Sequence, residues 1–152
     1  MTAPIPTMTE VLAFRVPAMP PTRTAQQKGA FVRNGRVRFF TKPGVAREAQ
    51  NTVALVVQSL PDGWEPLDGP LELRLKLVYP YRKSEPKKRT KDGAELPHDV
   101  RGDLDNICKG IVDALTTAAV WRDDAQVSRM VLSKWWGPRP YWEVRVAKLE
   151  SI

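Results

Sequence analysis

The stretch DLDNICKGIVDALTTA, residues 103–118, combines an apolar helical stripe with a cluster of acids. Its large apolar side chains recur every three or four positions, the spacing of one helix face: Leu104, Ile107, Ile111 and Leu115. This spacing predicts a helix over residues 104–118 that packs on a core. Aspartates and a lysine stand outside the stripe, so the same helix is the first candidate for chemistry.

Further elements follow on either side of this helix. Leucines alternate with charged residues over 71–77, the period of a strand with one buried face. Residues 43–60 place apolar side chains on one face of a second helix, which stops before Pro61-Asp62-Gly63. Asn34-Gly35 within residues 31–39 favours the type I′ turn of a hairpin.

The two ends of the sequence add strands. Residues 11–16 form a short strand that Pro17 stops. Residues 126–136 and 141–149 predict strands joined as a second hairpin across 137–140. In this order the elements predict an α+β fold, a mixed β-sheet with two α-helices and β-hairpins at both ends.

The length of 152 residues fits one domain. We expect this domain over residues 11–152, behind a flexible tail of residues 1–10. Residues 81–100 lie in a polar, turn-rich segment and are expected to form a basic mobile loop.

Charge indicates the partner. The net charge is +7 and the pI about 9.8, which favours nucleic acid or another anionic surface. General solubility is the alternative explanation, but clustered charge favours phosphate contact. The basic residues predicted to bind DNA are Lys28, Arg33, Arg36, Arg38, Arg82, Lys83, Lys87, Lys88, Arg89, Lys91 and Arg101.

Composition also argues against several classes. No apolar run approaches the ~20 residues of a membrane span, and no export signal is visible, so a cytoplasmic protein without a membrane partner is expected. The single cysteine, Cys108, cannot form an intrachain disulfide, which suits a reducing compartment. With one histidine, His98, the usual zinc sites are excluded, so a metal would be oxygen-ligated Mg²⁺ or Mn²⁺.

The acids at the start of the helix have two explanations. Asp103 and Asp105 converge only if Asp103 is in the extended segment before the helix or at its N-cap, and Gly102 gives the chain the freedom to turn there. Capping and the helix dipole explain either acid alone. A divalent metal held against a phosphodiester explains both.

Lys109 and the later acids are also open to two interpretations. Lys109 and Asp113 continue the face of Asp105 at intervals of one turn, which suits either an ion-pair ladder or a lysine beside a metal. Asp123 and Asp124 suit either a solvated turn or a third carboxylate returning to the metal, and the residues alone do not decide which of the two returns.

Three carboxylates with one or two Mg²⁺ ions would activate a water and neutralise the leaving oxygen. The residues therefore predict a metal-dependent phosphodiesterase acting on nucleic acid. A non-catalytic nucleic-acid-binding module, with the acids as caps and ion pairs, is the alternative.

The run Arg101-Gly102-Asp103-Leu104-Asp105-Asn106-(x)2-Lys109, with Asp113-Ala114-Leu115 and Trp121-Arg122-Asp123-Asp124-Ala125-Gln126-Val127, resembles the RusA family of Holliday junction resolvases. The resemblance is strongest over residues 101–130. It implies a homodimeric endonuclease of recombination and repair, often encoded by phages and prophages, that uses Mg²⁺ or Mn²⁺ to nick two opposed strands of a four-way junction.

The resemblance also assigns residues. It implies that Asp103, Asp105 and Asp124 are the catalytic, metal-binding carboxylates and that Lys109 is the essential lysine. Asn106, Asp113 and Asp123 form a second tier, with Asp113 structural. A nuclease that prefers forks or flaps is the nearest alternative within this class.

Aromatic residues near the last loop remain open to three explanations: core and edge packing, a dimer interface, or stacking on an unpaired base. The same question arises for Phe39 and Phe40, for which core and edge packing is again the first expectation.

Overall fold

The computed structural model describes residues 6–21 and 28–150, with side chains 28, 29 and 41 outside the description. It confirms a single α+β domain whose elements run as follows: β1 (Thr7–Val16), β2 (Lys28–Arg33), β3 (Arg36–Thr41), α1 (Pro43–Ser59), β4 (Leu71–Pro80), α2 (Lys87–Thr90), β5 (Leu96–Pro97), α3 (Leu104–Thr117), the 3₁₀ turn η1 (Asp124–Gln126), β6 (Val127–Gly137) and β7 (Tyr141–Glu150). No helix in these residues is long and apolar enough to cross a membrane.

Strand β4 lies at the centre of a mixed five-stranded sheet with the order β1-β7-β4-β6-β5. It pairs in parallel with β6 and antiparallel with β7. The alternating leucines predicted to face the core do so: Leu71, Leu73, Leu75 and Leu77 are at most 2% exposed. A strand with such an apolar face is shielded from water best at the centre of a sheet.

The prediction that residues 126–136 and 141–149 pair as a hairpin is therefore wrong. Strands β6 and β7 run antiparallel, but β4 lies between them and takes the hydrogen bonds that each would give the other. The loop after Gly137 passes over the end of β4 instead of making a tight turn. Alternation along a strand predicts which face is buried but not which neighbour it pairs with.

The first strand is longer than predicted. It starts at Thr7, because residues 7–10 pair with residues 147–150 of β7. These four residues thus belong to the sheet, whereas residues 1–5 of the expected tail lie outside the described part of the chain.

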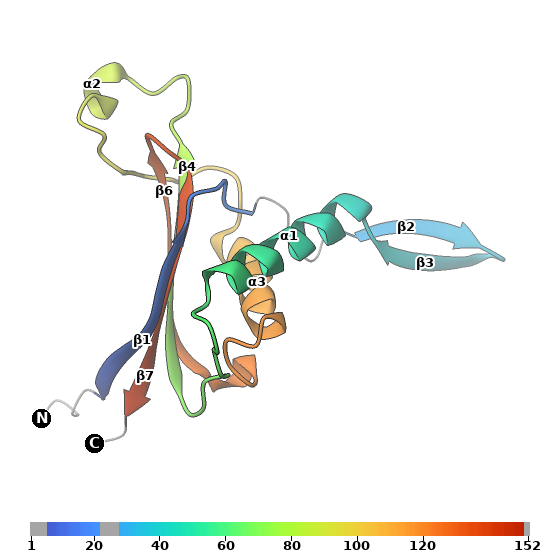
Figure 1. Cartoon of the computed structure of the whole chain (residues 1–152). Helices are drawn as coiled ribbons and strands as arrows, with labels where there is room; N and C mark the ends of the chain where they lie inside the picture. The colour runs from blue at the N-terminus through green and yellow to red at the C-terminus, as the bar shows by residue number, and fades with distance from the viewer. Residues whose placement is uncertain (1–5, 22–27, 151–152) are drawn as a thin grey trace, which may run out of the picture.

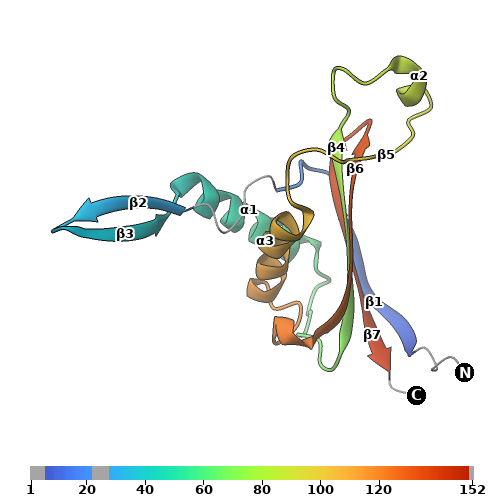
Figure 2. The same ribbon diagram turned by 180° about the vertical axis from the view of Figure 1, so that it is seen from behind.

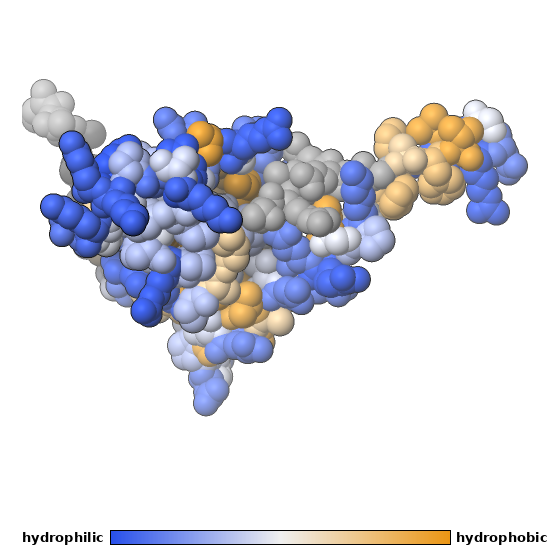
Figure 3. Space-filling view, turned by 90° about the horizontal axis from the view of Figure 1, so that it is seen from above, coloured by the Kyte–Doolittle hydropathy of each residue, from blue (hydrophilic) through white to orange (hydrophobic). Residues whose placement is uncertain are grey.

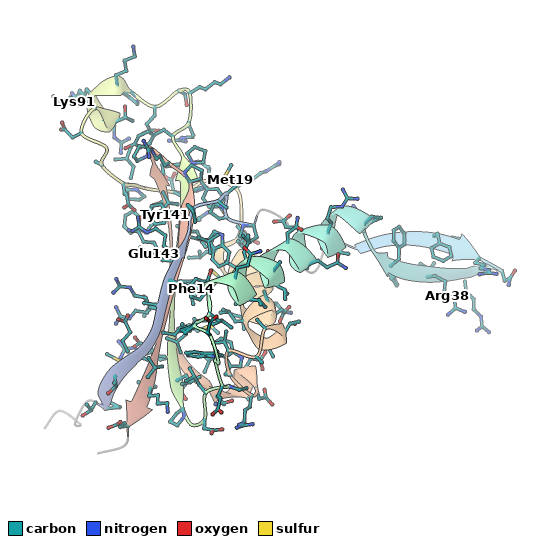
Figure 4. The ribbon with its side chains drawn as sticks, viewed as in Figure 1. Phe14, Met19, Arg38, Lys91, Tyr141 and Glu143 are labelled. Atoms are coloured by element: carbon teal, nitrogen blue, oxygen red, sulfur yellow. The ribbon has the colours of Figure 1, made fainter. Side chains whose placement is uncertain are left out.

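Helices α1 and α3 pack together on one face of the sheet (Figures 1 and 2). The predicted stripe of α3 is buried, with Ile111 and Leu115 fully covered. Phe14 points toward α1, whereas Tyr141 and Glu143 lie on the opposite face of the sheet (Figure 4). That opposite face is polar, with ion pairs such as Arg15–Glu143 and Arg74–Glu72.

The β2–β3 hairpin forms a separate two-stranded sheet that projects from the body as an arm (Figures 1 and 2). Its predicted Asn34-Gly35 turn is confirmed, with positive φ at both residues. Only Lys42 separates β3 from α1. The expectation that Phe39 and Phe40 pack in the core is wrong, since they are 72% and 42% exposed on this arm.

The basic segment over residues 81–100 contains α2 and β5. Glu85 is buried and pairs with Arg82 at 2.9 Å and Arg89 at 3.1 Å. At its far end, Glu95 pairs with Lys76 at 2.9 Å. The mobility expected of this segment stays a prediction, but its acids hold part of it in a defined shape.

Candidate active site

The start of α3 exposes two carboxylates, those of Asp103 and Asp105. Gly102 has φ +112°, a conformation that favours glycine, and a Cβ there would lie 3.0 Å from the Ile107 side chain. Asp103 is the N-cap residue in extended conformation, yet its side chain caps no backbone N–H. Its carboxylate instead accepts a 3.3 Å hydrogen bond from Asn106, as an orienting contact would. Capping therefore does not explain Asp103.

Asp105 lies in the first turn of α3, with Lys109 and Asp113 further along the same exposed side. Among the residues that the structure describes, none of the three forms an ion pair. An ion-pair ladder is thus not what these residues make. The ammonium of Lys109 stays available to an anion beside Asp105, and such a charge would stabilise a phosphate.

A residue that the sequence did not suggest positions this start. Lys134 of β6 donates hydrogen bonds to the carbonyl oxygens of Val100 at 2.7 Å and Gly102 at 2.8 Å. It thereby ties the loop before Asp103 to the sheet. The one available signal was a lysine at a helix-facing position of a strand, where an apolar residue is expected.

His98 fixes the same loop from its other side. Its ring stacks on Trp136 at 3.8 Å between centroids and meets Tyr79 edge-on. Burial lowers the pKa of His98, and the nearby charge of Lys134 lowers it further. The imidazole is thus a packed, neutral ring at pH 7 that holds the chain in place.

At the other end of α3, Asp123 and Asp124 behave differently. Asp123 accepts a 2.9 Å hydrogen bond from the Ala125 N–H, and Gln126 accepts one in return from the Asp123 N–H, a complete capping box on η1. The Gln126 amide also donates to the carbonyls of Leu67 and Gly69. Asp124 is exposed and, within the described residues, its carboxylate has no partner.

These two ends lie far apart in one chain. Helix α3 has 14 residues and so is about 21 Å long. Strand β6 gives a second measure, because Lys134, which holds Gly102, lies seven residues or about 23 Å along it from Val127. Asp124 is therefore at the opposite end of the helix from Asp103 and Asp105.

The carboxylate side chains of this site are suitable ligands for a hard cation. One chain, however, does not bring enough of them together to hold it. Carboxylate oxygens are the ligands that Mg²⁺ and Mn²⁺ prefer. Nowhere in residues 6–21 and 28–150 do three carboxylate, thiol or imidazole side chains come together to hold a metal. Strand β6 begins beside the end of α3, so within one chain neither Asp123 nor Asp124 returns to the side of Asp103 and Asp105.

Comparison with known proteins identifies the family. Residues 19–147 match the family described as Endodeoxyribonuclease RusA. The chain belongs to this family. The match includes the start of α3, η1 and the arm, so RusA endonuclease activity, the cutting of DNA within a strand, is the activity of its class.

A curated relative covers nearly the same span. The chain is 30% identical over 136 residues to the uncharacterized protein YqaN of Bacillus subtilis (strain 168), covering 86% of this chain and 92% of that protein. The similarity covers most of the fold and adds no activity of its own.

The basic side chains of this RusA protein gather in two places. Those of residues 81–91 surround α2, and those of the arm lie near its tip, with Arg101 exposed before α3. The side chain of Lys28 lies outside the described residues. Seen from above, both regions are hydrophilic, and an apolar band lies between the tip of the arm and the body (Figure 3). Lys91 and Arg38 mark the two regions in Figure 4.

Cys108 takes no part in this RusA site. It is 1% exposed in the core side of α3, and burial raises the pKa of its thiol to about 12. A thiol that stays protonated is neither a metal ligand nor a nucleophile near pH 7.

Proposed function

We propose that this protein is a Holliday junction resolvase that makes paired, symmetric nicks in four-way DNA junctions during recombination and repair, as a homodimer that requires Mg²⁺ or Mn²⁺. The observation that carries the proposal is the set of exposed carboxylates on Asp103, Asp105 and Asp124 in a strongly basic RusA chain. Asp123 is already used by its capping box, which supports Asp124 as the third acid.

We further propose that the catalytic site is shared between two copies. Asp124 lies about 20 Å from Asp105 within one chain, a distance that follows from the length of α3. In a two-fold dimer, each α3 start would meet the η1 of the other copy and both sites would be equivalent. Two equivalent sites would suit a four-way junction, whose arms are related by an approximate two-fold axis.

Acidic and basic residues would have different roles. Asp103 and Asp105 would hold the cation, with Asn106 orienting Asp103. Lys109, one turn further, would contact the phosphate that is cut. The basic segments around α2 and on the arm would bind the DNA backbone, so that affinity falls steeply with salt.

The first experiment tests substrate and metal together. The protein is incubated with a mobile four-way junction, a fork, a flap and a linear duplex, each with Mg²⁺, Mn²⁺ or EDTA. We expect paired symmetric nicks in the junction alone and none in EDTA. Preferential cutting of forks or flaps would establish the alternative nuclease, and binding without any cutting would establish the non-catalytic module.

The second experiment tests the shared site. As homodimers, Asp105→Asn and Asp124→Asn are each expected to cut at least about 100-fold more slowly than the natural protein. A heterodimer of the two, isolated by two affinity tags, contains one intact site. We expect this heterodimer to make single nicks. An inactive heterodimer would show that the three acids act within one chain or do not act together.

Lys109→Ala is expected to lower the cleavage rate far more than junction affinity, because its charge serves the phosphate being cut. Lys148→Ala, on β7, is the matched control. Equal losses of cleavage and binding would reassign Lys109 to simple backbone contact.

A further inference from the structure

The two faces of the β2–β3 arm differ in chemistry. Antiparallel register places Phe31 opposite Arg38 and Arg33 opposite Arg36 on one face, which Phe40 joins. The rings of Phe31 and Phe40 lie 6.1 Å apart between centroids. We call this set the aromatic–arginine face. The other face is wholly apolar at its described positions: Ala30, Val32, Val37 and Phe39.

The arginines of the aromatic–arginine face have no acidic partners. Among the described residues none of Arg33, Arg36 and Arg38 forms an ion pair, in contrast to Arg82 and Arg89, which Glu85 holds. The sequence shows why, since residues 11–47 contain no aspartate or glutamate. The charge on the arm is therefore available to an external anion.

The arm also does little for the stability of the fold. Every described side chain from residue 30 to 40 is exposed, and Phe31 and Phe40 remain 46% and 42% exposed. A two-stranded ribbon on its own is marginally stable in water. An exposed arm that carries aromatic rings and unpaired cations is better explained by a ligand than by folding.

The shape of the arm's tip suits a flexible single strand of DNA. A shallow hollow of about 730 Å³ is lined by Phe31, Arg33, Arg36 and Arg38 of this face, together with Asn34 of the turn and Phe39 of the apolar face. Aromatic rings that stack bases, combined with cations that track the backbone, are the usual chemistry of single-strand binding. An intact duplex offers no free base face, whereas a branch point does.

We infer that the aromatic–arginine face binds a DNA strand at the branch point, with an unstacked base on Phe31 and Phe40 and the flanking phosphates on the three arginines. The inference rests on the proposed function, because it requires branched DNA as substrate. Its positive charge alone would predict that the arm binds only the DNA backbone. The inference adds a contact between the arm and DNA bases.

The test uses the Asp105→Asn protein, so that DNA remains uncut, and a junction with 2-aminopurine at the branch point. Phe31→Ala/Phe40→Ala is expected to raise the junction Kd about 5- to 150-fold and to abolish the fluorescence change on binding. Affinity for linear duplex should change little. Unchanged affinity for the junction and an unchanged fluorescence signal would overturn the inference.

The arginines are tested by salt. Arg33→Ala/Arg36→Ala/Arg38→Ala is expected to reduce the slope of log K against log salt by about 2 for a single strand. An unchanged slope would remove the arginines from the contact and overturn that part of the inference.

Val32→Thr/Val37→Thr is the matched control, because it changes the apolar face of the same strands. It is expected to bind the junction as well as the parent protein. If this control becomes monomeric and loses binding while Phe31→Ala/Phe40→Ala binds normally, the arm packs on a second copy and the inference is wrong. Failure of the proposed function has a different signature, since the unmodified protein would then not cut junctions.

Discussion

The two ends of α3 each present exposed carboxylates, but the chain positions them by different means. At the start, Gly102 is held by Lys134, which lies 32 residues away on β6. At the end, Asp123 and Gln126, three positions apart, close a capping box. The start thus depends on tertiary contacts and the end on local hydrogen bonds, so damage to the two ends should have distinguishable consequences.

The largest effect should come from the free carboxylate at the end of α3. Asp124→Asn is expected to lower the cleavage rate by about 10²–10³-fold, the scale of losing one preorganised charged group. Its unfolding temperature should not fall, because Asp124 has no partner in the described chain. Single-turnover cleavage and thermal unfolding measure the two, and a well-folded active variant would exclude Asp124 from catalysis.

The next effect concerns the start. Lys134→Met is expected to lower the cleavage rate about 10–100-fold, the usual range for a group that orients ligands. Junction affinity should change much less, and Mg²⁺ dependence should shift to higher concentration. If affinity and rate fall together, Lys134 contacts DNA and does not act by positioning.

A smaller effect is expected at Asp123. Asp123→Ala loses the cap on η1 and should lower stability by about 1 kcal/mol, or a few degrees in Tm. Cleavage should largely persist, because the carboxylate of Asp124 remains. This variant is compared with Asp124→Asn at the neighbouring position. If Asp123→Ala loses cleavage and Asp124→Asn loses stability, then Asp123 is the catalytic acid and Asp124 the structural one.

The smallest effect is a pH dependence at the start. Because the pKa of His98 is lowered below its ordinary value of about 6.5, the unfolded chain binds the proton more readily. The stability that the neutral ring contributes is therefore present above pH 6.5 and declines as the pH falls below it. Urea unfolding between pH 5 and 8 should show this decline in the natural protein and not in His98→Phe.

Local patterns predicted much of this fold. Helix α3 starts at the predicted residue and ends one residue early, and the Asn34-Gly35 turn and the leucines of β4 are as expected. Each depends on residues within a few positions of one another. The need for glycine before Asp103 was also visible, because an N-cap after a sharp turn is a local requirement.

Long-range relations could not be predicted in the same way. The insertion of β4 between β6 and β7 depends on competition among strands with similar patterns. The role of Lys134 appears only when β6 meets the loop before α3. The distance between Asp105 and Asp124 is different, because the helix predicted over residues 104–118 already separates the two acids.

The pairing of β1 with β7 has a consequence for folding. Thr7 lies opposite Glu150, so the first strand of the sheet has the last strand as its partner. Contacts of such long separation in sequence form slowly, because the intervening chain must be ordered first. On the ribosome, β1 stays without a neighbour until β7 has been synthesised, whereas α1 and the arm, built from adjacent residues, can form well before the sheet is complete.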